Sequence, residues 1–389
     1  MSESYMRDRV KDMPESLLWK FFSLARQTPG VISLSVGEPD FPTPWHISEE
    51  GIYAIEKGRT YYPPSKGLEQ LRKGVPEYYR RRFGVEGYET ENVLVTCGAS
   101  EAIDLACRCV LNPGDECIVL DPGYVAYEPL VKMVGGVPVY LKLEESDGFK
   151  VKPQQLEALI TPRTKAIILN YPSNPTGGVM SEEDYAAIVP ILAKHHIVAI
   201  CDEIYLELTY EGEKASIARF RDVLKDHLIV VNGFSKAWSM TGWRLGYALA
   251  EPVIIDAMNK VHQFSAMGPA TPCQFAAIEA VNPRSDKDIE THFESFRGRR
   301  NFLVNQLNRM GLPTAMPKGA FYVFPNISST GLSSYDFASR LLTEAHVVVI
   351  PGNAFGPAGE GFVRISYAYS LDSLKEACVR IAKFLEQFH

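Results

Sequence analysis

The 389-residue sequence lacks several features that mark whole classes of protein. It has no internal repeat, no low-complexity tract and no dense block of basic residues, which argues against fibrous proteins and against nucleic-acid binding as the main activity. Its hydrophobic runs, such as 166–169 and 197–201, are far shorter than the roughly 20 residues that span a bilayer. With 46% hydrophobic residues and a net charge of -7, the composition favours a soluble enzyme that acts on small molecules.

Cysteine spacing gives no sign of a disulfide framework. The seven cysteines are an odd number without repeated spacing, so we expect free thiols in a reducing cytoplasm. Neither Cys107 with Cys109 nor His195 with His196 has the two- to four-residue gap of typical zinc ligands, so no metal site is expected. The cysteines are Cys97, Cys107, Cys109, Cys117, Cys201, Cys273 and Cys378.

Between about residues 92 and 250, short β-branched runs alternate with helical patterns. Strands that are apolar throughout belong in a sheet that helices cover on both faces. The pattern therefore predicts an α/β fold whose seven strands form a mostly parallel sheet between helices. The predicted strands are 92–96, 116–120, 138–141, 165–169, 197–201, 228–231 and 245–250.

The last hundred residues have a different pattern. A long charged helix is predicted at 286–310, stopped by Gly311 and Pro313, and such a helix could bridge two domains. The chain beyond this helix is predicted to form an α+β unit. Its predicted elements are a strand at 320–324, a helix at 335–344, strands at 347–350 and 362–366, and a closing helix from Asp372.

Two local signals bear on individual helices. Ser181 is predicted to cap a helix, with Asp184 as a weak partner in a capping box. In the predicted helix 68–83, Gly74 and Pro76 stand two residues apart, and we expect them to kink or split it.

The segment 232–246 carries the strongest chemical signal. Lys236 comes after the predicted strand 228–231 in apolar and aromatic surroundings, at the end of a strand where α/β sheets bind ligands. A partly desolvated amine loses its proton more easily and can attack an aldehyde. Ser235 and Arg244 add a hydroxyl and a guanidinium, which suit a phosphate dianion. A lysine after a strand is, on its own, more often a solvated side chain.

The surroundings of the lysine resemble a known signature. Ser235-Lys236, with Arg244 eight residues further on, is similar to the motif of class I/II aminotransferases, enzymes of pyridoxal-phosphate (PLP) fold type I. Seven such matches in order are far more specific than one. The other six are Gly37-Glu-Pro-Asp40, Tyr62 to Gly67 with Leu71-Arg72, Gly98-Ala-Ser100, Asn174-Pro-Thr-Gly177, Asp202-Glu-Ile-Tyr205 and Arg364-Ile-Ser366.

The resemblance implies a large PLP-binding α/β domain at 40–285 and a small α+β domain made of both chain ends, 1–39 and 286–389. It implies pyridoxal 5′-phosphate as the cofactor, with Lys236 as its attachment point and as the catalytic acid and base. Asp202 would pair with the pyridine nitrogen, and Tyr205 would bind the phenolic oxygen. A carboxylate at that nitrogen favours the protonated ring, which makes the cofactor a better electron sink. Taken alone, Asp202 could instead cap a helix.

The phosphate is expected at the start of the helix that opens near Gly98, Ala99 and Ser100. Backbone N–H groups and the helix dipole favour an anion there. Ser235 and Arg244 would complete the phosphate site. Such a sequence before a helix is also common capping chemistry, so this assignment depends on the other motifs.

The resemblance also places the substrate. Arg364 would bind its α-carboxylate through a planar two-point contact that lysine cannot make, and the backbone of Gly37 would approach the same carboxylate. Asn174 would contact both the phenolic oxygen and this carboxylate. Tyr124 would stack on the cofactor, although an aromatic residue there could belong to the core. Tyr62 would reach the phosphate of a neighbouring subunit, which implies a homodimer.

The substrate is less well determined. We find no match to the second arginine with which one branch of the family binds a distal carboxylate. The chain is closer to aspartate and aromatic aminotransferases and to the related acetyl-diaminopimelate enzymes, so aspartate or an aromatic donor with 2-oxoglutarate is expected. A C–S lyase or a cyclopropane-carboxylate synthase on the same fold stays open. A PLP-binding transcription regulator is disfavoured, because no basic helix-turn-helix precedes the motifs.

Overall fold

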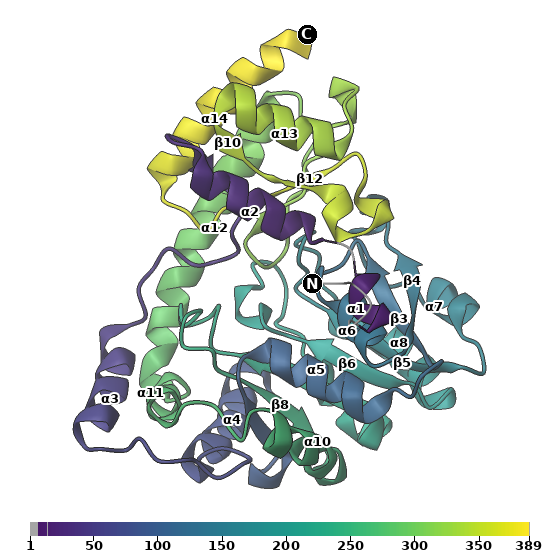
Figure 1. Ribbon diagram of the computed structural model, residues 1–389, viewed down its shortest axis with the longest axis vertical. Helices are drawn as coiled ribbons and strands as arrows, with labels where there is room; N and C mark the ends of the chain where they lie inside the picture. The colour runs from purple at the N-terminus through teal and green to yellow at the C-terminus, as the bar shows by residue number, and fades with distance from the viewer. Residues whose placement is uncertain (1–6, 14, 389) are drawn as a thin grey trace.

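The computed structural model describes residues 7–13 and 15–388. Its largest sheet has seven strands and lies in the lower half of the molecule as drawn in Figure 1. The strand order is β2-β8-β7-β6-β5-β3-β4. Strand β8 runs antiparallel to both of its neighbours, and all other neighbouring pairs are parallel, which confirms the predicted mostly parallel sheet. The strands are β2 (Val93–Thr96), β3 (Glu116–Asp121), β4 (Val137–Lys142), β5 (Thr164–Asn170), β6 (Val198–Asp202), β7 (Leu228–Gly233) and β8 (Gly246–Ala250).

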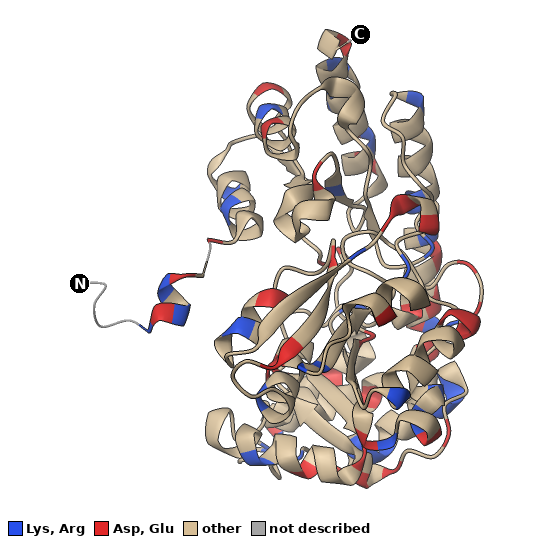
Figure 2. Cartoon of the chain, turned by 90° about the vertical axis from the view of Figure 1, so that its right-hand side faces the viewer, with Lys and Arg blue, Asp and Glu red and all other residues tan. Residues whose placement is uncertain are grey.

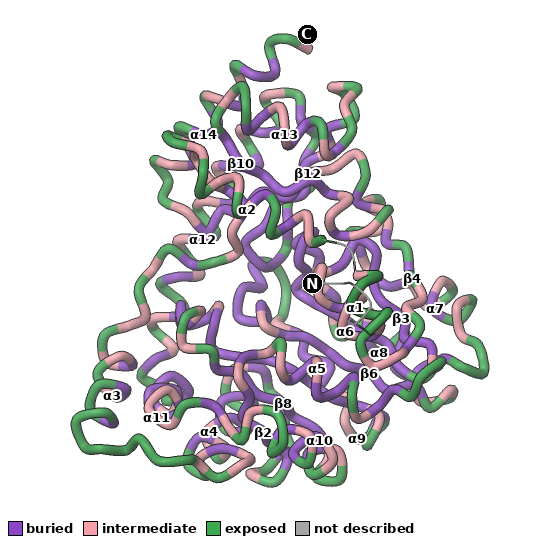
Figure 3. Tube along the Cα trace, viewed as in Figure 1, coloured by how far each residue is buried: buried purple, intermediate pink, exposed green. Residues whose placement is uncertain are grey.

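Apart from the edge strand β4, the strands of the sheet are buried on both faces (Figure 3). Successive side chains of a strand point to opposite faces, so Ile167 and Leu169 of β5 pack in one core while Ala166 and Ile168 pack in another. This arrangement explains why the strands are apolar throughout instead of alternating. One core is closed by α5 (Ala99–Val110), α6 (Tyr127–Met133) and α10 (Pro252–Ser265); the other by α4 (Glu69–Phe83), α7 (Pro153–Leu159), α8 (Glu182–Lys194) and α11 (Thr271–Ala280).

The C-terminal part has a three-stranded antiparallel sheet of its own, in the order β11-β12-β9. The strand predicted at 347–350 is wrong as a single element, because its two halves pair in different sheets. The elements are β9 (Tyr322–Val323), β10 (Val347–Val348), β11 (Ile350–Pro351), β12 (Val363–Ser366), α12 (Asp286–Arg309), α13 (Ser334–Ala345) and α14 (Leu371–Leu385).

The N-terminal segment lies beside these C-terminal elements, as Figure 1 shows for α2 (Leu17–Gln27). Strand β1 (Ile32–Ser33) pairs in parallel with β10. The division into domains at 40–285 and at 1–39 with 286–389 stays a prediction. The other helices are α1 (Asp8–Lys11), α3 (Trp45–Glu56), which packs against α11, and α9 (Arg221–Leu224).

Two expectations about helices have different outcomes. The capping box is confirmed, because the Ser181 hydroxyl accepts a hydrogen bond from the Asp184 N–H and the Asp184 carboxylate accepts one from the Ser181 N–H. The predicted split of the helix at Gly74 and Pro76 is wrong, since α4 runs through both residues. A Cβ atom at Gly74 would lie 2.7 Å from a Val281 methyl group, so this glycine allows close helix packing. The buried contacts of α4 outweigh its poor local propensity.

Charged residues of both signs are interspersed over the cartoon in Figure 2. Among the residues that the structure describes, no helix combines the length and the apolar composition needed to cross a membrane.

Candidate active site

A cavity of about 500 Å³ lies at the carboxyl ends of the parallel strands, where α/β sheets bind ligands. It brings together residues from β5, β6, β12, the start of α5 and the segment after β7. Gly98 does not line the cavity itself, but it comes directly before the lining residues Ala99 and Ser100. The predicted site residues that line the cavity are Gly37, Ala99, Ser100, Tyr124, Asn174, Asp202, Tyr205, Ser235, Lys236, Arg244 and Arg364.

Lys236 is half-buried in this cavity. Its Nζ atom donates a hydrogen bond of 2.7 Å to the carbonyl oxygen of Gly37 and lies 5.9 Å from the ring centroid of Tyr205. Burial, together with the positive charges of Arg244 and Arg364, lowers the pKa of the amine to about 8, although the carboxylates of Glu38 and Asp202 oppose the shift. A larger fraction of this amine is therefore neutral at physiological pH than of an ordinary lysine.

Asp202 is the last residue of β6 and is buried. Burial raises the pKa of its carboxyl to about 6, against the N–H of Ile204 and the hydroxyl of Tyr127, which both stabilise the ionised form. The Ile204 N–H lies 3.0 Å from Oδ1, and the Tyr127 hydroxyl lies 2.9 Å from Oδ2. The backbone carbonyl of Asp202 also accepts a hydrogen bond of 3.0 Å from the Asn170 side chain. The carboxylate is thus held in one orientation.

Two glycines let the predicted phosphate site form. Gly98 caps α5 with φ at 81°, and a Cβ atom there would lie 2.8 Å from Nη2 of Arg244. A Cβ atom at Gly246 would come within 2.5 Å of the Ala99 nitrogen. Only glycine at both positions lets the guanidinium and the strand approach the start of the helix. The exposed Arg244 side chain therefore lies beside the N-terminal N–H groups of α5, which favour an anion.

Arg364 is fully buried on β12 and held from several sides. Its Nη1 donates a hydrogen bond of 2.9 Å to Oδ1 of Asn174, and its Nη2 donates to the carbonyl oxygen of Ser35. The guanidinium carbon lies 4.4 Å from the ring centroid of Tyr322 and 4.8 Å from that of Phe355. Its Nε has no hydrogen-bond partner among the described residues. No carboxylate among the described residues pairs with Arg364, and a buried cation held only by neutral groups suits an anionic ligand.

Tyr322 connects several of these groups and was missed by the sequence analysis. Its hydroxyl lies 2.8 Å from the Tyr205 hydroxyl. A Cβ atom at Gly37 would collide with the Tyr322 hydroxyl, so a glycine is required there. Tyr127 was missed as well. A second tyrosine three residues after Tyr124 is the signal that could have indicated it.

Tyr62 is not brought to the cavity within one chain. Its side chain is 83% exposed and does not line the cavity. Its predicted place in a neighbouring subunit's active site stays a prediction.

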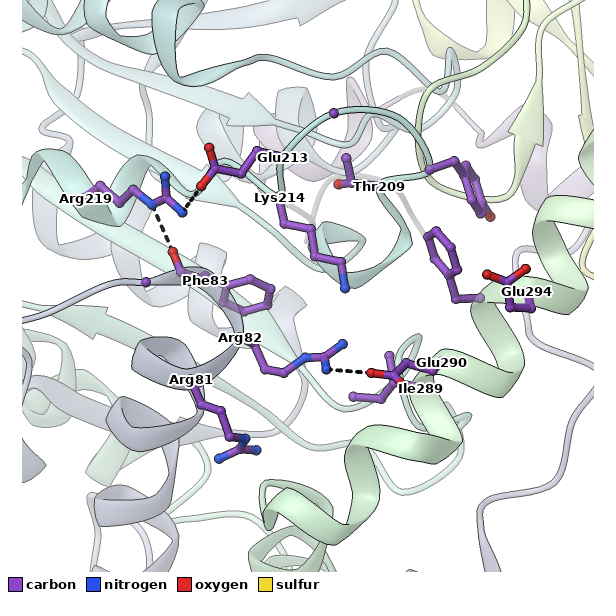
Figure 4. Close-up of a pocket in the computed structure, with 14 residues that line it drawn as sticks. Arg81, Arg82, Phe83, Thr209, Glu213, Lys214, Arg219, Ile289, Glu290 and Glu294 are labelled. Atoms are coloured by element: carbon purple, nitrogen blue, oxygen red, sulfur yellow. Dashed lines mark hydrogen bonds and ion pairs between the residues drawn. The ribbon is translucent and has the colours of Figure 1, made fainter.

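A second cavity, of about 850 Å³, lies between α4, α12 and the segment 209–219 (Figure 4). None of the predicted site residues lines it. Its cations are already paired: Arg82 lies 2.9 Å and Lys214 2.5 Å from the Glu207 carboxylate, and Arg219 contacts Glu182 and Glu213. With its charges compensated, this cavity is poorly suited to an ionic ligand.

The residues of the first cavity fit pyridoxal 5′-phosphate. The group needs an amine for its aldehyde, an anion site for its phosphate and a carboxylate for its ring nitrogen. Lys236, the start of α5 with Arg244, and Asp202 offer these three. All three line the same cavity, so one cofactor could contact them together.

Comparison with known proteins points in the same direction. The sequence profile of the family described as "Aminotransferase class I and II" matches residues 29–381. The Bacillus subtilis protein YugH is 45% identical over 99% of each chain, and an aspartate aminotransferase of Pyrococcus abyssi is 40% identical over 98% of each. The crystal structure of an aromatic aminotransferase from Pyrococcus horikoshii has a TM-score of 0.89 at 40% identity, covering 94% of this chain and 99% of that one.

Proposed function

The chain belongs to the class I and II aminotransferases, and from this premise we propose that it moves the amino group of an L-amino acid to a 2-oxo acid with pyridoxal 5′-phosphate bound to Lys236. Aspartate or an aromatic amino acid is the proposed donor, and 2-oxoglutarate the acceptor. The observation that supports this most is the placement of Lys236, Asp202, Arg244 and Arg364 in one cavity.

The residues around the proposed cofactor ring have distinct roles. Lys236 would hold the cofactor through its amine, and the free Nζ would take the proton from the substrate α-carbon. When bound, pyridoxal 5′-phosphate withdraws electrons from that carbon. Asp202, held by the Tyr127 hydrogen bond, would keep a proton on the pyridine nitrogen. Tyr205 would bind the phenolic oxygen, and Tyr124 would pack on the ring.

The phosphate and the substrate are proposed to bind to different residues of the cavity. The backbone of Gly98, Ala99 and Ser100, the Ser235 hydroxyl and the Arg244 guanidinium would bind the phosphate. Arg364 with Asn174 and the Gly37 backbone would orient the substrate α-carboxylate, which is supported by the 2.9 Å contact between Arg364 and Asn174.

We also propose a homodimer in which Tyr62 reaches the active site of the neighbouring subunit. The high exposure of Tyr62, 83%, is consistent with a contact outside its own chain. Size-exclusion chromatography with light scattering tests the dimer. A cytoplasmic location is proposed because all seven cysteines, each within the described residues, are free thiols.

The test of the activity is a panel in which holoenzyme and 2-oxoglutarate are offered each common amino acid, and acetyl-diaminopimelate, with glutamate formation measured over time. Glutamate formation with at least one donor is expected. Amino acid without an acceptor separates transfer from lyase chemistry. A transferase stalls after one turnover, whereas continuous release of ammonia and pyruvate would identify a C–S lyase and overturn the proposal.

A further inference from the structure

Helix α2 presents aromatic and apolar side chains to the active-site cavity. Leu18, Trp19 and Phe22 of this helix line it, and Met13, which precedes the helix, lines it as well. The rings of Trp19 and Phe22 pack edge to face, with centroids 5.5 Å apart. Trp19 is nevertheless 66% exposed, which is unusual for a large aromatic side chain that only fills a core.

The position of α2 is fixed from its other side. Phe21 is fully buried and packs edge to face against Tyr335 of α13 at 5.9 Å. Lys20 donates a hydrogen bond of 2.8 Å to the Tyr335 hydroxyl. The helix therefore has one face in the core and one face, with Trp19 and Phe22, on the cavity.

Further apolar side chains line the same cavity. They are Ile103 of α5, and Val125 and Pro129 around the start of α6. A flat apolar side chain can be buried against such residues without leaving a polar group unpaired, and aromatic rings gain further from edge-to-face contacts.

Each positively charged side chain that lines the cavity already has a role in the proposed function. Among the described residues that line it, the Lys and Arg side chains are Lys236, Arg244 and Arg364. They are assigned to the cofactor, its phosphate and the substrate α-carboxylate. Lys20 of α2 is held by Tyr335 on the face away from the cavity. The side-chain carboxylate of a donor such as aspartate would thus be dehydrated when it packs against Trp19 and Phe22, and it would gain no ion pair in return.

We propose, on the basis of the proposed function, that Trp19 and Phe22 bind the side chain of the amino donor and that the enzyme prefers aromatic donors to aspartate. The two aromatic residues determine specificity and take no part in the chemistry.

The test measures the donor half-reaction alone, so that binding of the acceptor does not enter. Holoenzyme is mixed with phenylalanine or aspartate, and the spectral change of the cofactor is recorded as a function of donor concentration. The wild type is expected to favour phenylalanine by at least about 10-fold in the apparent second-order rate constant, the scale on which apolar pockets discriminate.

Trp19→Ala is expected to lose about 10-fold for phenylalanine, mainly through weaker binding, and to change aspartate by less than about 2-fold. Trp45→Ala is the matched control, since Trp45 is 68% exposed on α3 and does not line the cavity; both donors should be unaffected. Phe22→Leu is a second variant on the α2 side of the cavity, and it keeps an apolar side chain at that position.

Three results would overturn the inference while leaving the proposed function intact: a wild type that favours aspartate, an equal loss for both donors in Trp19→Ala and Phe22→Leu, or an unchanged phenylalanine reaction in both variants. Failure of every donor to change the cofactor spectrum, in contrast, would overturn the proposed function itself.

Discussion

The hydroxyl of Tyr127 donates a hydrogen bond of 2.9 Å to the carboxylate of Asp202, the group proposed to hold the cofactor nitrogen protonated. Burial alone raises the pKa of Asp202, and this bond counteracts that effect. Tyr127 has no counterpart in the motifs that identify the family, yet it acts on the most important acid of the site.

Tyr127→Phe should therefore impair the enzyme more at low pH than at high pH. A hydrogen bond to a charged group contributes about 1.5–3 kcal/mol, so its loss should raise the Asp202 pKa by at least about one unit. The carboxylate is then protonated at a higher pH, and the acid limb of the kcat profile should move upward by about one pH unit. Tyr53→Phe, at an exposed tyrosine of α3, is the control. An acid limb in the same place in both variants would contradict the role of Tyr127.

Lys236→Ala should retain pyridoxal 5′-phosphate without a covalent bond. The visible absorption band of the lysine-bound cofactor should be missing, and transfer should fall by at least about 1000-fold, because the tether and the proton carrier are both lost. Absorption spectra and glutamate formation test this. The exposed Lys57→Ala should behave as the wild type. A persistent lysine-type band in Lys236→Ala would show that another amine holds the cofactor.

Arg364→Lys tests whether a planar two-point contact binds the substrate. The guanidinium is stacked between aromatic rings and bonded to Asn174, a geometry that an ammonium group cannot reproduce. We expect the KM of amino donors to rise by about 100-fold, which corresponds to the loss of one or two charge-assisted hydrogen bonds. The resting cofactor spectrum should not change. An unaltered KM would remove Arg364 from the substrate site.

Arg82→Ala should reduce the free energy of unfolding by about 3 kcal/mol, because it leaves the buried Glu207 carboxylate with an incomplete ion pair. Burial works to raise the pKa of Glu207, but the bonds from Arg82 and Lys214 outweigh it and lower the pKa. A carboxyl group whose pKa is lower in the folded protein than in the unfolded chain stabilises the fold above the unfolded-state pKa. This stability is lost as the pH falls through the folded-state pKa.

The difference in the free energy of unfolding between wild type and Arg82→Ala, measured by urea denaturation, should therefore shrink below about pH 4. Arg80→Ala, an exposed position in the same helix, is the control. A difference that does not depend on pH would contradict the ion-pair explanation.

Much of the fold is determined by local pattern. Strands such as β5 are buried on both faces, so their sequences are apolar throughout and their positions are predictable to within a residue or two. The break expected in α4 failed because Pro76 is a local signal, whereas the packing that keeps the helix intact comes from the far side of the core. The strand predicted at 347–350 failed because the same apolar run serves two sheets.

The site shows the same limit. Residues in contiguous motifs, such as Asp202 and Tyr205, were expected at the site from the sequence, and both line the cavity. Tyr322 and Trp19 could not, since each meets the site only through contacts between distant parts of the chain, and an isolated aromatic residue looks like any other core residue.

The pairing of β1 with β10 also has a consequence for synthesis. The Lys20–Tyr335 contact joins residues 315 positions apart, and β1 pairs with β10 across a similar separation. On the ribosome, the segment that contains α2 emerges well before the residues against which it packs and cannot dock until they have been made. Contacts of such large sequence separation form slowly, and the apolar face of α2 is uncovered in the meantime. During synthesis this face is therefore open to unwanted apolar contacts until α13 has formed.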